Sequence, residues 1–248
     1  MSPPFKSSEK FAAVFGSPGL RVRFVGFARI FWPFMLVVFV EGVLLGCLFP
    51  QHKIPPFTLV AAIVALAIAT IALFGVAERR FESFLKGAKG EEITARELTL
   101  LGPGWDIFHG IATGAGDSAR AGFDFDHIVV GPDTVFLVET KNWEGGIRVE
   151  NGVPRYNGAP MKRSPVVQVR RGARILARML EQALPPDFEI MKIVCFASNI
   201  LEGEEAVSDD VRLCNVRSLR SAIMESPPGA LDEPHRKIVI ETLARKAP

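Results

Sequence analysis

The chain has 248 residues, of which 48% are hydrophobic, and a formal net charge of +2 at pH 7. A net charge this small gives no argument for a nucleic-acid partner, and three scattered cysteines are too few for a disulfide framework or a zinc knuckle. The hydrophobic residues are concentrated between positions 30 and 77, where 35 of 48 residues are apolar. The remainder has the composition of an ordinary soluble domain, which excludes a uniformly apolar transporter and argues against a wholly soluble chain.

Two apolar runs, Ile30–Phe49 and Phe57–Ala77, account for this concentration. Each is long enough to cross ~30 Å of hydrocarbon as a helix, which takes roughly 20 residues. The link over 50–56 carries one lysine, whereas several lysines and arginines precede the first run and follow the second. The positive-inside rule therefore predicts two transmembrane helices in the cytoplasmic (inner) membrane, with both chain ends in the cytoplasm. Glu41 lies within the first run and needs a polar partner, which the sequence does not name.

From residue 78 onward, the pattern indicates an α/β domain with a central sheet. The expected elements are a helix over 78–101, strands over 105–112, 125–130 and 135–141, a glycine-rich hairpin over 145–158, a helix over 165–183, strands over 192–197 and 211–214, and two helical pieces at the end. A glycine-rich loop over 113–122 and an acidic loop over 201–210 lie between them. We therefore expect a basic segment (1–29), the membrane helices (30–77), a folded domain (78–200) and its C-terminal extension (201–248).

The two strands around the turn at residues 131–133 carry the residues best suited to chemistry. Glu139 and Lys141 are two residues apart, so a strand points both side chains to one face. With a two-residue turn, Asp126 lies directly across from Glu139, and Asp124 across from Lys141. Two carboxylates this close repel unless a cation lies between them or one is protonated. Carboxylate oxygens bind Mg²⁺, and a lysine beside the metal suits phosphodiester hydrolysis. A cross-strand ion pair on a solvated face is the alternative.

The helix expected over 165–183 is basic. Between Lys141 and Leu180, nine lysines and arginines stand against two acids, a net charge of +7. A surface of this kind suits a phosphate backbone. The arginines expected to contact nucleic acid are Arg163, Arg170, Arg171, Arg174 and Arg178. A solvated arginine face and contact with anionic lipid headgroups are the alternatives.

Four blocks of sequence resemble the nuclease-related domain (NERD) family, and they occur in that family's order. The blocks are Gly87-Ala88-Lys89-Gly90-Glu91, which resembles a KGxxGE-type helix segment, Phe125–Pro132 (FDHIVVGP), Val138–Gly145 (VETKNWEG) and Ser164–Gln168 (SPVVQ), where serine replaces the usual asparagine. The resemblance covers residues 86 to about 197. It implies a fold like that of PD-(D/E)xK nucleases, with a mixed sheet flanked by helices.

The resemblance also implies a metal-dependent nuclease site. Glu91, Asp126 and Glu139 would be the metal ligands for Mg²⁺ or Mn²⁺, Lys141 the catalytic lysine and Gln168 an accessory residue on the helix. Alternatives stay open at each position. Glu92 or Glu97 could replace Glu91, Asp124 competes with Asp126, Gln168 could cap its helix, and His127 is expected to pack on the opposite strand face.

We therefore expect a membrane-anchored, divalent-metal-dependent nuclease that hydrolyses DNA on the cytoplasmic side. The alternative is a catalytically inactive, membrane-tethered module that binds nucleic acid or protein and keeps a nuclease-like fold. The sequence does not indicate an oligomeric state.

Overall fold

A computed structural model describes residues 11–46, 55–113, 123–161 and 163–247. Most of the expected glycine-rich loop and most of the 50–56 link lie outside these residues. The chain divides into two compact units. One comprises the described residues up to Leu20 together with those from Gly87 onward, and the other comprises Arg21–Lys86.

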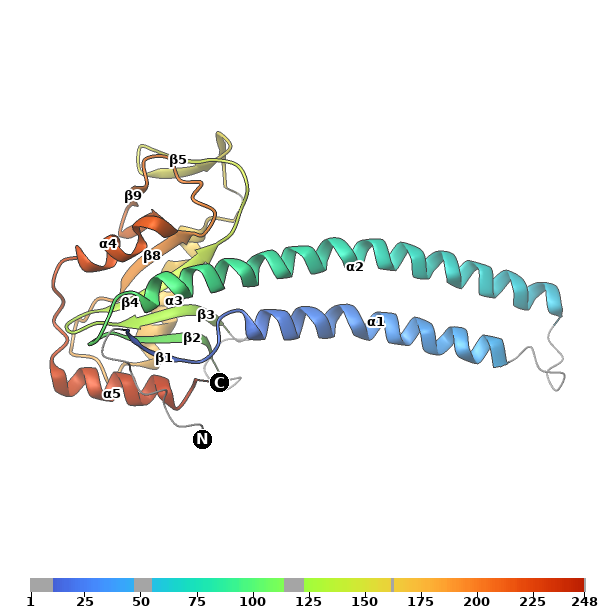
Figure 1. Ribbon diagram of the computed structural model, residues 1–248, viewed down its shortest axis with the longest axis horizontal. Helices are drawn as coiled ribbons and strands as arrows, with labels where there is room; N and C mark the ends of the chain where they lie inside the picture. The colour runs from blue at the N-terminus through green and yellow to red at the C-terminus, as the bar shows by residue number, and fades with distance from the viewer. Residues whose placement is uncertain (1–10, 47–54, 114–122, 162, 248) are drawn as a thin grey trace. The chain divides into compact units, whose positions relative to one another are not determined.

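The first unit is built on a mixed β-sheet (Figure 1). Its strands lie side by side in the order β1 (Ala13–Phe15), β2 (Asp106–Ala112), β3 (Asp124–Val130), β4 (Val135–Lys141), β8 (Met191–Phe196), β10 (Val211–Asn215) and β9 (Glu205–Ser208). β3 runs antiparallel to both of its neighbours, β2 and β4. β8 runs parallel to both of its neighbours, β4 and β10. A smaller sheet contains β5 (Ile147–Glu150), β6 (Val153–Tyr156) and β7 (Ala159–Pro160).

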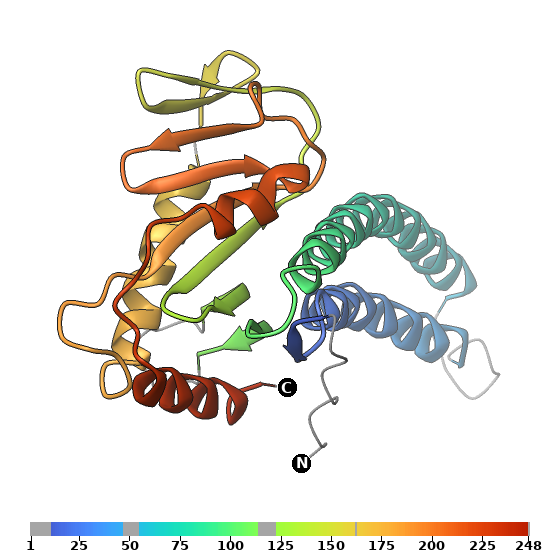
Figure 2. The same cartoon turned by 60° about the vertical axis from the view of Figure 1, so that its left-hand side comes forward.

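Helices cover both faces of the main sheet (Figure 2). One face packs against α3 (Pro165–Met179) and α5 (Glu233–Ala244), because the β-strand residues of that face form one apolar core with buried residues of these helices. The other face packs against the end of α2 (Pro56–Thr99) and against α4 (Leu219–Met224), which follows the short 3-10 helix η1 (Val216–Ser218). This arrangement confirms the expected α/β fold with a mixed sheet flanked by helices.

Two strands differ from the expectation. β1 lies before the first apolar run and pairs in parallel with β2. β9 lies within the expected acidic loop and pairs antiparallel with β10 across the Asp209-Asp210 turn, at the edge of the sheet. The helix expected to reach residue 183 ends at Met179.

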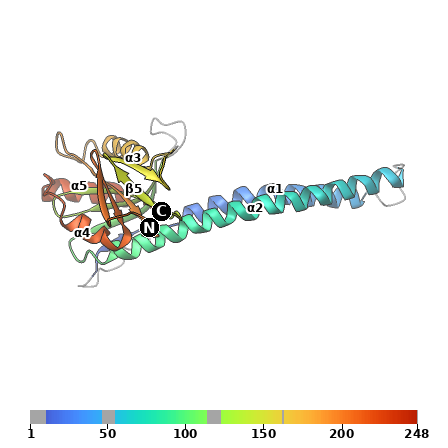
Figure 3. The same ribbon diagram turned by 90° about the horizontal axis from the view of Figure 1, so that it is seen from above.

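The second unit consists of two helices that run side by side, α1 (Leu20–Gly46) and the first part of α2 (Figure 3). Glu41 receives a hydrogen bond of 2.8 Å from the Thr70 hydroxyl, and Thr70 lies on the neighbouring helix. This contact supplies the partner that the sequence did not name. α1 begins ten residues before the first apolar run, and α2 extends beyond the second run through the charged stretch from Glu78 to Thr99.

Among the described residues, no stretch of α1, α2 or another helix is both long and apolar enough to span a membrane. The predicted transmembrane hairpin is therefore not confirmed.

Candidate active site

The first unit brings all five predicted site residues together. Asp126 comes from β3, Glu139 and Lys141 from the end of β4, Gln168 from the first turn of α3, and Glu91 from α2. The charges of Asp126 and Lys141 act on Glu91, and the charge of Glu91 acts on Glu139. Glu91, Asp126 and Glu139 form what we call the carboxylate cluster, and Lys141 is its neighbouring cation.

Glu139 is held by the side chains of Lys141 and Gln168 and is also hydrogen-bonded to Asp126. The Lys141 Nζ donates to Glu139 Oε1 at 2.5 Å, and the Gln168 Nε2 donates to the same oxygen at 2.6 Å. Lys141 also donates to Gln168 Oε1 at 3.1 Å. The Gln168 side chain therefore bonds to the strand residues and does not cap its own helix. Pro165, which has no N–H to satisfy, occupies the helix start.

Asp126 is held by the main chain of the opposite strand. The β3–β4 ladder pairs His127 with Val138 and Val130 with Val135, which is the register expected from the sequence. Beyond His127 a hydrogen bond to a side chain takes the place of the main-chain hydrogen bonds between the strands. The Thr140 N–H donates to Asp126 Oδ2 at 2.8 Å. The turn and the strand alternation therefore place Asp126 beside Glu139.

Glu91 reaches the cluster from a helix because glycines permit close approach. A Cβ on Gly90 would lie 2.6 Å from Asn142 Cβ, so only glycine lets α2 touch the loop that follows Lys141. The N–H of Gly19 donates to Glu91 Oε2 at 2.9 Å. Nothing in the sequence pattern indicated this second contact.

Burial raises the pKa of each carboxyl in the cluster. Burial, and then the charge of Asp126, raises the pKa of Glu91 to about 8. Burial, and then the charge of Glu139, raises the pKa of Asp126 to about 8. Burial also raises the pKa of Glu139, although Lys141 opposes it. One ammonium does not offset three buried carboxylates, so the cluster holds protons at neutral pH or accepts a further cation.

The donor chemistry of the cluster fits a divalent metal. Carboxylate oxygens are the ligands that Mg²⁺ and Mn²⁺ accept. The nitrogen donors bond to Oε2 of Glu91, Oδ2 of Asp126 and Oε1 of Glu139, and the carboxyls of Asp126 and Glu139 also bond to each other. Within the part of the chain that the structure describes, however, no group of three or more His, Cys, Asp or Glu side chains is arranged to hold an ion. Metal ligation by the cluster therefore stays a prediction.

Residues 86–197 match the family described as the nuclease-related domain, NERD. The chain contains a nuclease-related domain. All five residues predicted for catalysis lie within the match, and the strands and helices of the first unit continue beyond it on both sides.

One curated relative is an uncharacterized protein of Bacillus anthracis, 33% identical over 108 residues. The matched stretch covers 40% of this chain and 49% of that protein, so the match spans about half the length of the relative. No solved structure matches the chain.

Within the nuclease-related domain, the alternatives to the predicted acids lie differently. On α2, Glu91 is the acid on which the charges of Asp126 and Lys141 act, and it is 8% exposed. Glu92 and Glu97 are half-buried. Asp124 is exposed at the start of β3 and pairs with Ala112 of β2. Its charge contributes least among the causes that raise the pKa of Asp126.

A buried polar chain behind the cluster was missed by the sequence reasoning. His109 Nδ1 and His127 Nδ1 lie 2.7 Å apart, and His127 Nε2 lies 3.2 Å from the Thr140 hydroxyl. Both imidazoles are buried, and burial lowers the pKa of His109 to about 4 and that of His127 well below its usual value. His127 faces away from Asp126, as strand alternation predicts. Its pairing with His109 was not visible, because it depends on the β2–β3 register.

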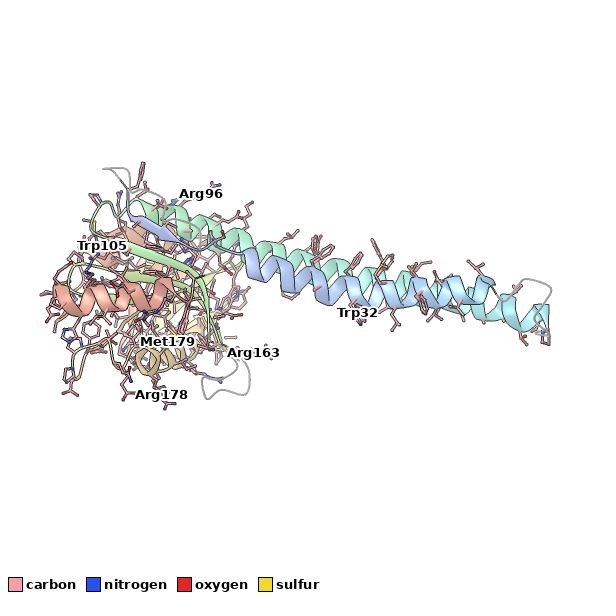
Figure 4. All side chains as sticks on the ribbon, turned by 90° about the horizontal axis from the view of Figure 1, so that it is seen from below. Trp32, Arg96, Trp105, Arg163, Arg178 and Met179 are labelled. Carbon is pink, nitrogen blue, oxygen red and sulfur yellow. The ribbon has the colours of Figure 1, made fainter. Side chains whose placement is uncertain are left out.

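The arginines of the basic helix have different surroundings. Arg170 forms ion pairs with Asp209 and Asp210, at 2.8 and 2.5 Å, so the acidic segment partly neutralises it. Arg163, Arg171, Arg174 and Arg178 are exposed, and Figure 4 shows Arg163 and Arg178 pointing outward. With Lys192, Arg170 and Arg174 line a pocket of about 400 Å³ beside α3.

Proposed function

We propose that the chain is a divalent-metal-dependent nuclease that hydrolyses phosphodiester bonds of DNA. The observation that supports the proposal is the carboxylate cluster inside a nuclease-related domain, in which Glu91 and Glu139 are buried, Asp126 is half-buried and the charge of Lys141 acts on all three. A structural ion pair needs only one acid for one base. Here two further acids lie near the same lysine, although burying carboxylates that no base neutralises costs free energy.

Glu91, Asp126 and Glu139 would hold the metal. When bound, Mg²⁺ or Mn²⁺ would lower the pKa of water and would offset the negative charge on the phosphoryl oxygens. The protein's own part is to keep these carboxyls buried, close together and fixed by the donors of Gly19, Thr140 and Gln168. Their raised pKa values would fall on ligation, so metal binding would release protons.

Lys141 would act on the phosphate group directly. Its side chain is 18% exposed, so a substrate oxygen can approach it while Glu139 and Gln168 fix its position. A fixed cation stabilises negative charge that develops on a phosphoryl oxygen in the transition state. Gln168 is a positioning residue, because its amide bonds to both of these side chains.

The exposed arginines of α3 support a nucleic-acid substrate. Arg171 lies one helical turn from Gln168, and Arg174 and Arg178 continue from it toward the far end of the helix. Contacts of this kind attract any phosphate backbone and carry no base sequence. The choice of DNA over RNA rests on the resemblance to nucleases.

A cleavage panel tests the proposal. The purified full chain, in detergent if it needs one, is incubated with duplex DNA, single-stranded DNA and RNA, with Mg²⁺, Mn²⁺ or EDTA. We expect DNA cleavage with metal, loss of cleavage in EDTA, and a fall of at least about 10³-fold in Glu139→Gln and Lys141→Met. The control, Glu181→Gln, changes an exposed acid just after α3 and should keep wild-type activity. Cleavage in EDTA, or full activity of Glu139→Gln, would contradict the proposal.

The second candidate is a non-catalytic module that binds nucleic acid or protein. Its supporting observation is that protein donors already occupy one oxygen of each carboxyl in the cluster. It predicts DNA binding that survives Glu139→Ala, weakens in Arg171→Gln/Arg174→Gln and falls steeply with salt. Binding without cleavage under all metal conditions would favour it.

Location at the cytoplasmic membrane stays a prediction. Its support is the set of exposed apolar side chains on α1 and α2, among them Ile71, 74% exposed, and Trp32, also 74% exposed and labelled in Figure 4. Fractionation of cells that express the full chain tests it. Recovery in membranes that withstand carbonate washing is expected, and recovery in the supernatant would contradict it. Binding of the arginines to anionic lipid is tested by comparing vesicles with and without anionic headgroups.

A further inference from the structure

The segment from Ala12 to Gly19, which we call the N-terminal segment, lies outside the nuclease-related match and is built into the same unit (Figure 2). Its strand β1 pairs in parallel with β2. The Ala13 N–H donates to the Trp105 carbonyl at 2.9 Å, and the Phe15 ring stacks on Phe108 with centroids 4.6 Å apart. Main-chain and side-chain contacts thus fix the segment to the sheet edge.

The segment ends against the helix that carries Glu91. Gly19 has a φ of +69°, which favours glycine, and a Cβ at this position would lie 3.0 Å from Ala88 Cβ. Gly19 is buried, and its N–H donates to Glu91 Oε2 at 2.9 Å. The residues that donate to the other two acids of the cluster, Thr140, Gln168 and Lys141, lie within residues 86–197, whereas Gly19 does not.

We propose that the N-terminal segment is a functional part of the nuclease site, in which the Gly19 N–H positions Glu91 and β1 holds Gly19 in place. The inference rests on the proposed function. Gly19 is a positioning residue, since it acts through Glu91. A main-chain donor fixed by a strand has no side-chain freedom to lose, so it can hold one carboxylate oxygen while the other stays available to a ligand.

Matched variants of the full chain test the two steps separately. Gly19→Ala introduces a strained φ and a contact with Ala88, whereas its control Gly16→Ala carries a similar strain (φ +81°) at a different place in the segment. Phe15→Ala removes the ring that stacks on Phe108, and its control Phe11→Ala removes a ring that is 44% exposed. Glu91→Ala removes the acceptor of the Gly19 N–H, whereas Glu91→Gln keeps an amide oxygen as the acceptor and removes the ionisable carboxyl.

Two readouts are used. Hydrogen exchange of the Gly19 amide reports the contact whether or not the chain cleaves DNA. It should quicken by about tenfold or more in Glu91→Ala and Phe15→Ala and stay unchanged in Phe11→Ala. The Mg²⁺ concentration for half-maximal cleavage should rise by about tenfold or more in Gly19→Ala and by far less in Gly16→Ala. This comparison requires that the two variants have the same unfolding midpoint.

The outcomes separate this inference from the proposed function. If the Gly19 amide exchanges at the same rate in wild type and Glu91→Ala, the contact does not hold the carboxylate and the inference is overturned. Equal losses of metal response in Gly19→Ala and Gly16→Ala also overturn it. If no variant, wild type included, cleaves DNA, the proposed function fails. Mn²⁺ binding by wild type and Gly19→Ala then decides: weaker binding in Gly19→Ala supports the positioning of Glu91, and equal binding overturns it.

Discussion

Gly90 and Gly87 lie one turn apart on α2 and have opposite surroundings. A Cβ on Gly90 would meet Asn142 at 2.6 Å, whereas a Cβ on Gly87 would have nothing within 4 Å. We expect Gly87→Ala to raise the free energy of unfolding by about 0.5–1 kcal/mol through helix propensity. We expect Gly90→Ala to lower it by about 1–3 kcal/mol through overpacking, and to reduce cleavage because the loop after Lys141 must move. Urea unfolding and cleavage assays check both, and equal stabilisation by the two variants would contradict the close contact.

At the same scale, the buried histidines show where residue type alone misleads. A lone histidine in a strand is usually packed, and His127 is. Its hydrogen bond toward Thr140 connects it to the residue whose N–H holds Asp126. The sequence predicted the face of His127 from alternation. The sequence could not predict the partner of His127, because His109 is 18 residues away. The register between β2 and β3 depends on the long loop that joins them, and the length of such a loop does not determine the register.

At the scale of the element, α3 divides its arginines between an ion-pair network and solvent. Arg170 is bound by Asp209 and Asp210, whereas Arg171 and Arg174 are exposed. We expect Arg171→Gln and Arg174→Gln each to weaken DNA binding and to reduce the slope of log K against log salt by about 1. Arg170→Gln should leave that slope unchanged. Binding isotherms at several salt concentrations check this, and an equal slope change in Arg170→Gln would show that its ion pairs open on DNA.

The elements also show how far the sequence could predict the fold. The β3–β4 hairpin and its register followed from a turn and two alternating runs, so the sequence alone placed Asp126 and Glu139 opposite each other. β1 was missed because three residues, Ala13–Phe15, carry no periodicity and pair with a strand about 90 positions later. β9 was missed because the acidic segment that contains it is typical of a loop, and its pairing with the neighbouring β10 makes it a strand.

At the scale of the whole molecule, buried titratable groups make the folded state sensitive to pH in opposite directions. The pKa values of Glu91 and Asp126 are raised to about 8, so the stability they contribute is present at low pH and is lost as the pH rises toward 8. The pKa of His109 is lowered to about 4, so its contribution is lost as the pH falls from about 6.5 toward 4. Between pH 6.5 and 8 only the carboxyls of this set titrate.

We therefore expect the free energy of unfolding to fall most steeply between pH 6.5 and 8, by up to about 1.4 kcal/mol per pH unit for each such carboxyl. Below pH 6.5 the histidines oppose this trend and flatten the curve. Glu91→Gln should reduce the steep fall, and Mg²⁺ should stabilise more at pH 8 than at pH 6 if the cluster binds it. Urea unfolding across this range measures both, and an unfolding free energy that rises from pH 6.5 to 8 would contradict the burial of the acids.

The contact between Gly19 and Ala88 has a consequence for how the chain is assembled. The 21–86 stretch is inserted into the sequence of the sheet unit, and the residues that flank it, Gly19 and Ala88, lie close together. The sheet unit is therefore built from two segments that are separated in sequence by the whole insertion. During synthesis β1 therefore cannot pair until β2 has been made. This edge of the sheet cannot form until the whole insertion has been translated.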